Sequence, residues 1–432
     1  MTMPTGNASL DRRALHRAGL RVLVFSQVLG GAGLAAGITV GALLAEDMLG
    51  STRFSGLPAA LFTLGSAIAA LLVGRVSQRW GRRPGLALGY AAGAVGGAGV
   101  ALAAVLDNPV LLLIGLLVYG SGTATNLQAR YAGADLAPPD RRGAAISTVL
   151  VATTLGAVAG PNLVQPTGRL SEQVGIPALA GPFLLAATAY VLAALVLMVW
   201  LRPDPLLTAR ALADADANAP TTVAAPSGSG FATAPADVYD IAGLRLGAAA
   251  MVLTQVVMVA VMTMTPVHMR DQGHGLGATG LVIAVHIALM YLPSPLTGRL
   301  ADRYGSRPVL AASGVCLLTA GLLAAAAPED SVALLAFALA LLGLGWNLGL
   351  VGGTTLVTNA ASLDHRARTQ GRVDLAVALA GATGGLSSGL IVASTSYATL
   401  AVAGGLLALA ILPATLRAAE AKPTDNSLPS SI

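Results

Sequence analysis

The chain alternates long apolar runs with short polar stretches from one end to the other. Most of the runs are about 20 residues long, the length at which a helix crosses a bilayer core of about 30 Å. The pattern predicts six membrane-spanning helices, a longer polar interval and six more. The expected spans are Val22–Ala45, Gly56–Val76, Gly85–Leu106, Val110–Gln128, Ala144–Val164, Pro177–Leu201, Leu246–Val267, Gly277–Gly298, Val309–Ala327, Val332–Leu350, Val373–Ser394 and Tyr397–Leu416.

Composition agrees with a chain whose main surroundings are lipid. Hydrophobic residues make up 55% of the 432 residues and charged residues only 10%, whereas soluble domains carry about 25% charged residues. Nucleic-acid binding is not expected, because aromatic residues are only 4% and no basic surface with stacking aromatics is apparent. The first run is too long for a signal-peptide core and is interpreted as a retained helix. Cys316 is the single cysteine, so no intramolecular disulfide is possible.

The placement of basic residues predicts the orientation. Basic loops stay on the cytoplasmic side of a membrane. With both termini inside, all of the 25 Lys and Arg except Arg53, Arg169 and Arg270 are cytoplasmic. The expected domains are a six-helix bundle over 1–202, a flexible cytoplasmic tether over 203–241 and a second bundle over 242–432, because the interval is rich in Ala, Pro, Ser and Gly.

One polar segment occurs twice. The sequence that begins at Gly74 after the second helix, GRVSQRWGRR, returns 224 residues later at Gly298 as GRLADRYGSR. Glycine permits close helix approach, and a carboxylate in such a turn can accept hydrogen bonds from a neighbouring helix N-terminus. Two related halves favour a carrier in which the halves rock about a central site. The predicted gating residues are Gly74, Arg79, Gly81, Arg82, Gly298, Asp302, Arg303 and Gly305.

These segments resemble the signature of the major facilitator superfamily, Gly-x-x-x-Asp-Arg-x-Gly-Arg-Arg, found after helix two and often repeated after helix eight. The resemblance implies an all-α membrane fold of twelve helices in two pseudo-symmetric six-helix bundles. The first copy has Gln78 where the family usually has Asp. In relatives, this charge helps to hold the two halves together, a contact called the latch. Its loss here predicts that the latch rests more on Arg79, Asp135 and Asp302.

The end of helix five resembles a second family motif. Residues 156–161, GAVAGP, resemble the Gly-x-x-x-Gly-Pro core associated with antiporters, but Val164 and Gln165 replace its usual trailing glycines. Export is therefore not inferred from this segment.

The seventh and eighth helices are rich in residues that bind soft metals. Six of the ten methionines and three of the five histidines fall in 251–290. Met258 and Met262 are four residues apart, as are His286 and Met290, so each pair shares one helical face. Thioether and imidazole ligands together favour Cu(I). The sequence therefore predicts a substrate or metal site at these four residues.

This pattern, Met-x-x-x-Met followed by His-x-x-x-Met, resembles the CcoA-type copper importers of the same superfamily, which implies that the four residues pass copper through the cavity. A methionine pair in a membrane helix is usually a packing feature, and relatives of similar sequence carry solutes such as riboflavin. A proton-coupled carrier or exporter of a drug, vitamin or metabolite is therefore the alternative. Asn126, Gln255 and Asn347 are candidate cavity residues, although hydrogen bonding between helices is the commoner use of such amides.

The sequence indicates no enzyme and no cofactor. No Walker phosphate-binding loop is present, so ATP-driven transport is not supported. No carboxylate is expected deep in a helix: Asp135 and Asp374 lie near predicted cytoplasmic helix ends and are interpreted as structural partners of Arg130 or Arg372, which leaves His286 as the deep titratable group. The expected protein is a monomeric secondary transporter of the cell membrane with a small-molecule or metal-ion substrate. The rival class is a membrane receptor or assembly factor that has the same fold but does not transport.

Overall fold

The computed structural model describes residues 5–41, 44, 47–48, 57–218, 240–413 and 415, with side chains described except for 5–11, 35–39, 57–59, 157–162 and 276. This part of the chain is helical and contains no β-strand. The long helices of the first half are α1 (Thr5–Thr39), α3 (Leu57–Trp80), α4 (Arg82–Leu106), α5 (Pro109–Asp135), α6 (Arg142–Gln173) and α7 (Gly181–Trp200). Those of the second half are α9 (Ile241–Asp271), α10 (Leu276–Tyr291), α11 (Ser294–Tyr304), α12 (Ser306–Ala326), α13 (Val332–Ala360), α14 (Arg366–Ser394) and α15 (Tyr397–Ala408).

Many of these helices have the length and composition of membrane spans. Among the described residues, nine helical segments are long and apolar enough to cross a bilayer, and 397–413 forms a shorter apolar one. Large apolar side chains such as Val95, Leu155 and Leu390 are exposed on the outside of the bundle, as expected where lipid replaces water. Helices α1 and α6 cover most of the predicted first and fifth spans. Residues 42–43 and 45 of the predicted first span lie outside the described residues, and in the helix-five motif the backbone is helical but the side chains of 157–161 are not described.

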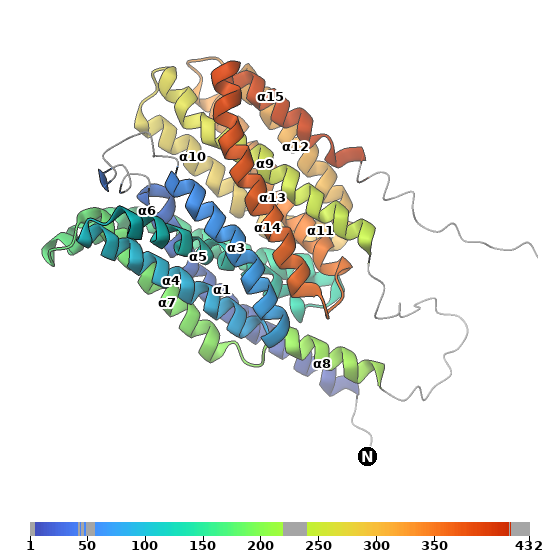
Figure 1. The fold of residues 1–432 in the computed structure, drawn as a ribbon. Coiled ribbons are helices and arrows are strands. Elements are labelled where there is room, and N and C mark those ends of the chain that lie inside the picture. Colours follow the sequence, from blue (N-terminus) through green and yellow to red (C-terminus); the bar gives the residue numbers. More distant parts are fainter. Residues whose placement is uncertain are drawn as a thin grey trace, which may run out of the picture.

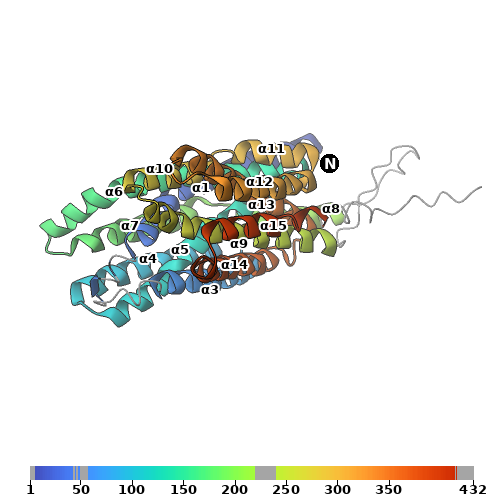
Figure 2. The same ribbon diagram turned by 90° about the horizontal axis from the view of Figure 1, so that it is seen from above.

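The helices form two groups, each with its own core. Leu23, Leu86, Tyr119, Phe183 and Tyr190 belong to one buried cluster within α1 to α7, the N-terminal half. A second cluster fills the group from α9 to α15, the C-terminal half. Figure 1 shows the blue-to-green helices on one side of the molecule and the yellow-to-red helices on the other, and in Figure 2, seen from above, the two sets overlap.

The predicted tether differs from the expected flexible segment at its beginning. A helix, α8 (Pro205–Ala217), occupies its first third. The side chain of Asp204 accepts from the amides of Leu206 and Leu207, and Pro205 stands at the first helical position, where its missing N–H has no cost. The prediction treated the alanines of this stretch as linker residues, although alanine is the strongest helix former. Residues 219–239 lie outside the described part, and the boundaries of the two halves stay a prediction.

Several helices begin or end at residues other than those predicted from the apolar runs. Helix α5 extends through Asp135 and helix α14 begins at Arg366, in each case several residues beyond the predicted limit. The predicted eighth helix is broken into α10 and α11, because Pro293 and Pro295 have no N–H to donate to the preceding turn. Asn347 fills part of this gap: its Nδ2 donates to the carbonyl of Met290 at 2.7 Å.

Candidate functional site

The two halves meet closely at one end of the bundle, where the repeated segments lie; this end is called the latch end. Its first contact joins α3 to α14. A Cβ atom on Gly74 would lie 2.8 Å from the carbonyl oxygen of Ala367 and 2.9 Å from Cα of Gly371. Only glycine at position 74 therefore allows the backbones of the two halves to touch, as small residues do in membrane helix packing.

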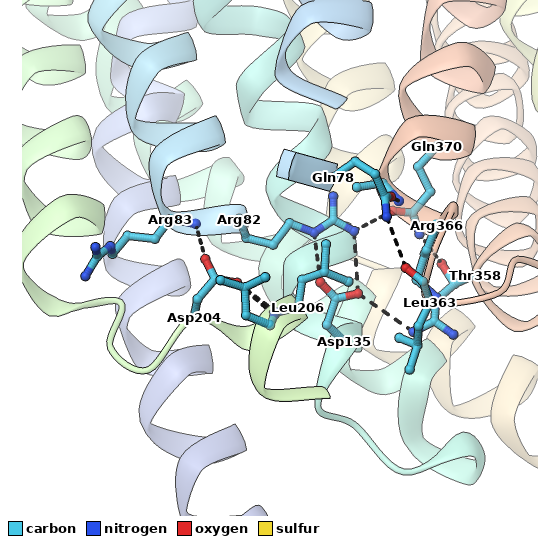
Figure 3. Close-up of polar contacts among 12 residues, drawn as sticks. Gln78, Arg82, Arg83, Asp135, Asp204, Leu206, Thr358, Leu363, Arg366 and Gln370 are labelled. Carbon is cyan, nitrogen blue, oxygen red and sulfur yellow. Dashed lines mark hydrogen bonds and ion pairs between the residues drawn. The ribbon is translucent and has the colours of Figure 1, made fainter. Parts of the chain in front are cut away.

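Gln78, one turn further along α3, is the principal hydrogen-bonding residue of this contact. Its Nε2 donates to the carbonyls of Leu363 and Asp364, at 3.2 and 2.5 Å. Its Oε1 accepts from the amides of Ala367 and Arg368, at 2.8 and 3.2 Å. Figure 3 shows this amide at the start of α14. A glutamine can bond carbonyls and amides at once, so the latch rests on Gln78 itself, which the sequence interpretation did not expect.

A matching contact joins α11 to α6. A Cβ atom on Gly298 would collide with the carbonyl oxygen of Gly143 and with Oγ of Ser147. Asp302 occupies the position in the second repeat that Gln78 has in the first. Its two carboxylate oxygens accept from the amides of Gly143 and Ala144, at 2.7 and 2.8 Å. In both repeats, the fifth residue therefore caps the first turn of a helix in the opposite half.

The repeats end in turns that need glycine for a second reason. Gly81 and Gly305 have φ angles of 99° and 86°, in the left-handed region that favours glycine. Arg79 and Arg303 lie just before these turns and contact the rings of Trp80 and Tyr304.

A buried ionic cluster lies behind the first contact. The Arg82 guanidinium pairs with the Asp135 carboxylate at 2.8 Å, and both side chains are fully buried. The same guanidinium donates to Oε1 of Gln370 in the C-terminal half at 2.5 Å, and Arg366 approaches Asp135 at 3.9 Å. Helix α8 adds Arg210, which donates to the carbonyls of Gln78 and Leu363. Figure 3 shows Arg82 and Asp135 of the N-terminal half converging with Arg366 and Gln370 of the C-terminal half.

A cavity of about 200 Å³ lies between the halves, next to the latch. Helices α3 and α5 contribute Phe62, Ser66 and Thr123 to its wall, while α9 contributes Gln255 and α14 contributes Asp374. Gln255 is held in place by the indole of Trp346, which donates to its Oε1 at 2.7 Å. An apolar wall with a few placed polar groups is the usual construction of a small-molecule site, but such sites measure about 300–1,000 Å³, so this cavity must widen to hold a solute of ordinary size.

Asp374 and Arg130 form an ion pair between the halves beside this cavity. Nη2 of Arg130 donates to Oδ1 of Asp374 at 2.7 Å, and the two side chains are 0% and 5% exposed. Arg130 also donates from Nε to Oγ1 of Thr354, at 3.0 Å, and Tyr131 donates to Oδ1 of Asp374, at 3.1 Å. Both acids were expected to pair with Arg130 or Arg372: Asp374 does pair with Arg130, whereas Asp135 pairs with Arg82, which was not expected. The expectation that no carboxylate lies deep in a helix is wrong, because α14 begins eight residues before Asp374.

The other two candidate amides lie within single halves. Asn126 accepts from Thr153 at 3.3 Å and donates to the hydroxyl of Tyr90 at 3.4 Å, inside the N-terminal half. Asn347 donates to the hydroxyl of Ser294 and accepts from that of Thr297, both at 2.6 Å, at the break between α10 and α11. Both amides bond helices together, and neither is among the residues that line the cavity between the halves.

The four predicted metal ligands lie in the core of the C-terminal half. Met258 and Met290 belong to its buried cluster, and Met262 packs against that cluster. His286 is 1% exposed, and its Nδ1 donates to the carbonyl of Leu339 on α13 at 2.9 Å. Its Nε2 is buried and has no hydrogen-bond partner among the described residues. None of the four lines the cavity between the halves.

Replacing Asn347 by leucine should lower the thermal stability of the protein. The substitution leaves the Met290 carbonyl without the Asn347 hydrogen bond at the helix break, which should cost about 1–3 kcal/mol. Thermal unfolding of the detergent-solubilised protein measures the effect. Asn218→Leu is the control, because Asn218 is exposed and its amide bonds only within α8. Equal unfolding temperatures for the two variants would contradict the assigned role.

The fold and the site define a class of protein. Two groups of helices enclose a small cavity between them, and a pair of related contacts closes the latch end of the bundle, as in membrane carriers. The model of the Major Facilitator Superfamily matches residues 22–293 and 246–431, and the chain belongs to this family. The fold class predicted from the sequence is confirmed, and the family and fold are those of membrane transporters, which are not enzymes.

Individual relatives cover nearly the whole chain. The MFS-type transporter YdeG of Bacillus subtilis is 54% identical over 93% of this chain and 92% of its own length. The riboflavin transporter RfnT of Brucella anthropi is 28% identical over 93% of this chain and 96% of its own length. Among solved structures, the human organic anion transporter MFSD10 has a TM-score of 0.73 at 17% identity, covering 93% of this chain and 99% of the other, which bears on the fold alone.

Proposed function

We propose that the protein is a secondary transporter that carries a small organic solute by alternating access, with riboflavin as the first substrate to test. The cavity between the halves is the observation that carries this proposal. It is lined by an aromatic ring, hydroxyls, an amide and one carboxylate, and both halves contribute to it. A solute held there would be handed from one side to the other as the halves rock. Similarity to a riboflavin transporter over nearly the full chain supports the choice of substrate.

The latch end is proposed to be cytoplasmic. Basic side chains gather there, among them Arg79, Arg83 and Arg303, which agrees with the rule that basic loops stay inside. Because the contacts at the latch end are formed, this conformation is proposed to face outward. Both termini would then lie on the cytoplasmic side of the cell membrane. The protein is proposed to act as a monomer.

Uptake of radiolabelled riboflavin tests the substrate, in cells that lack their own riboflavin uptake. Wild type should exceed empty vector, and Gln255→Ala should reduce initial uptake about tenfold, since a lost hydrogen bond to a bound solute costs about 1–1.5 kcal/mol. Gln173→Ala is the matched control, because Gln173 is exposed at the far end of α6. No uptake above empty vector would exclude riboflavin, and equal loss in both variants would remove Gln255 from the site.

Copper uptake is the second candidate, and one observation favours it. Because His286 donates from Nδ1 to a backbone carbonyl, its Nε2 carries a free lone pair in a buried, methionine-rich core. A histidine that binds a metal through one ring nitrogen usually donates from the other in this way. Met258, Met262 and Met290 would then be the remaining ligands.

Radiocopper accumulation in a copper-uptake-deficient host separates the two candidates. If copper is the cargo, His286→Gln and Met258→Leu should each lower accumulation about tenfold or more, since loss of a residue that only orients a ligand already costs about 10–100-fold. Met198→Leu is the control, since this exposed methionine lies on α7 in the other half. Accumulation that equals empty vector for wild type would exclude copper and leave the organic solute.

A further inference from the structure

A second cavity, of about 550 Å³, lies at the latch end and shares no residue with the cavity between the halves. It is called the basic cavity. Its walls come from the start of α1 and from the connection between α5 and α6, the short helix η2 (Pro139–Arg141). Figure 1 shows α1 starting at the same end of the molecule as α8. The basic residues of the wall are Arg12, Arg13, His16, Arg17 and Arg141.

The positive charge of the basic cavity has little compensation. No described carboxylate forms an ion pair with any of its four arginines, and Asp140 is the one acid among the described residues that line it. Nε of Arg12 is buried, and no described residue accepts a hydrogen bond from it, which is uncommon for a buried donor. Burial and the charge of Arg12 lower the pKa of His16, so this imidazole is neutral at neutral pH. Several guanidinium groups together match an anion with several acceptor oxygens, such as a phosphate.

An apolar groove of about 480 Å³ adjoins the basic cavity, and Arg17 lines both. One face of α1 forms most of its wall, because residues three and four positions apart lie on the same side of a helix. The wall consists of Arg17, Leu20, Arg21, Val24, Phe25 and Val28, with Thr148 from α6. The predicted first membrane span begins at Val22, so the arginines lie at its aqueous margin and the apolar side chains lie at membrane depth. The ring of Phe25 is exposed there, where lipid chains surround the bundle.

We propose that the basic cavity and the apolar groove together bind one anionic phospholipid, with its phosphate among the arginines and an acyl chain along α1. Each part of the site has the chemistry of one part of this ligand. Guanidinium groups bind phosphate oxygens, and apolar side chains at membrane depth pack against methylene groups. A soluble anion would leave the groove unused, and a zwitterionic lipid would bring a further cation to four arginines. The proposal does not depend on which solute the protein carries.

The position of the site agrees with the distribution of anionic lipids. Basic pockets beside membrane helices on the cytoplasmic side bind anionic headgroups, and the latch end is proposed to be cytoplasmic. Arg141 lies two residues before Gly143, whose amide donates to Asp302 of the opposite half at 2.7 Å. A headgroup held by Arg141 would therefore rest beside one of the two latch contacts.

Native mass spectrometry of the purified full-length protein in detergent counts bound lipids and tests the proposal. Wild type should bind phosphatidylglycerol at least about tenfold more tightly than phosphatidylcholine with the same acyl chains. Arg13→Gln combined with Arg17→Gln should weaken phosphatidylglycerol binding at least about tenfold, since each arginine near an anionic headgroup contributes about fivefold. Both side chains are exposed, so the variant should fold. Arg368→Gln combined with Arg372→Gln is the matched control, because these two exposed arginines are also four residues apart, near the start of α14 in the other half.

Two further measurements separate a lipid from a soluble phosphate. Inorganic phosphate at the concentration of the lipid should not displace phosphatidylglycerol. Val24→Trp fills the groove and should weaken phosphatidylglycerol binding at least about threefold, roughly the contribution of one buried methylene group. Val191→Trp is the control, since Val191 is exposed on α7, outside the groove, and its replacement should leave the affinity unchanged.

Three results would overturn the proposal. Equal affinity for the two lipids would remove the role of charge, and an equal loss in the Arg13 and Arg17 variant and in its control would remove the basic cavity. Displacement of the lipid by inorganic phosphate would make the cavity a site for a soluble anion. If the double variant does not fold, Arg17→Gln alone should weaken phosphatidylglycerol binding about fivefold. A failure to carry riboflavin or copper would leave these tests intact, because no cargo is present.

Discussion

Gly74→Val should hold the latch end open and stop transport while both halves stay folded. The new side chain would begin less than 3 Å from two backbone atoms of α14, the Ala367 carbonyl oxygen and the Gly371 Cα. Backbone atoms inside a helix cannot turn aside as the end of a side chain can, so the clash is relieved by separating the halves. Alternating access requires both end states, and a carrier that cannot close one end cannot complete its cycle.

A distance measurement and an uptake assay together measure this effect. Spin labels are attached to Arg141→Cys and Arg303→Cys, two exposed positions on opposite halves, after Cys316→Ser removes the native cysteine. Gly74→Val should lengthen the distance between the two labels and reduce uptake at least about tenfold, since a clash of a few kcal/mol exceeds the 1.4 kcal/mol of a tenfold change. Gly389→Val is the control: it lies on α14, and a Cβ there would meet nothing within 4 Å. A short, wild-type distance distribution in Gly74→Val would show that the α3–α14 contact is not the latch.

Arg82→Ala should destabilise the protein more than the loss of any one hydrogen bond at the latch end. The Asp135 carboxylate is fully buried and is bonded to Arg82 at 2.8 Å, while its other cation, Arg366, lies at 3.9 Å. Removing one partner of a buried pair costs about 3–5 kcal/mol, because the remaining charge is left without compensation. Thermal unfolding and the yield of folded protein in detergent measure this loss.

The neighbouring arginine supplies a matched control. Arg83→Ala removes the same charge one residue later, where the side chain points away from the cluster in Figure 3 and only the backbone amide bonds to Asp204. It should change the unfolding temperature little. Arg82→Met combined with Asp135→Leu removes both charges of the pair and should recover part of the lost stability, since buried Arg366 then loses the acid beside it. If Arg83→Ala is as damaging as Arg82→Ala, general loss of positive charge and not the buried pair is responsible.

Most of the fold could be predicted from the pattern of the sequence. Apolar runs of bilayer length place the helices, and the repeat at Gly74 and Gly298 indicates the two related halves. The ends of the helices could not be found in this way. An apolar run stops where lipid stops, whereas α5 and α14 continue as helices because the opposite half pairs their polar side chains.

The site was predicted less completely. Gln255 does line the cavity, but Asn126 and Asn347 have the same chemistry and serve as bonds between helices. An amide in a membrane helix indicates a polar contact, and the sequence does not say with what. The signal for Asp374 was present as a charge close to an apolar span. It was assigned to a helix end, because the start of α14 at Arg366 is set by contacts with Gln78 that no local pattern encodes.

The sequence by itself determined that the protein lies in lipid, and it gave the twelve predicted helices and the internal repeat. The length and spacing of apolar runs are properties of the chain alone. Only the tertiary structure decided which polar residues meet. Gln78 and Asp302 each cap a helix of the opposite half, and Arg130 finds Asp374 on a helix 244 residues away. Such pairings depend on how two bundles face each other, and in a low-dielectric interior they determine which end of the carrier is closed.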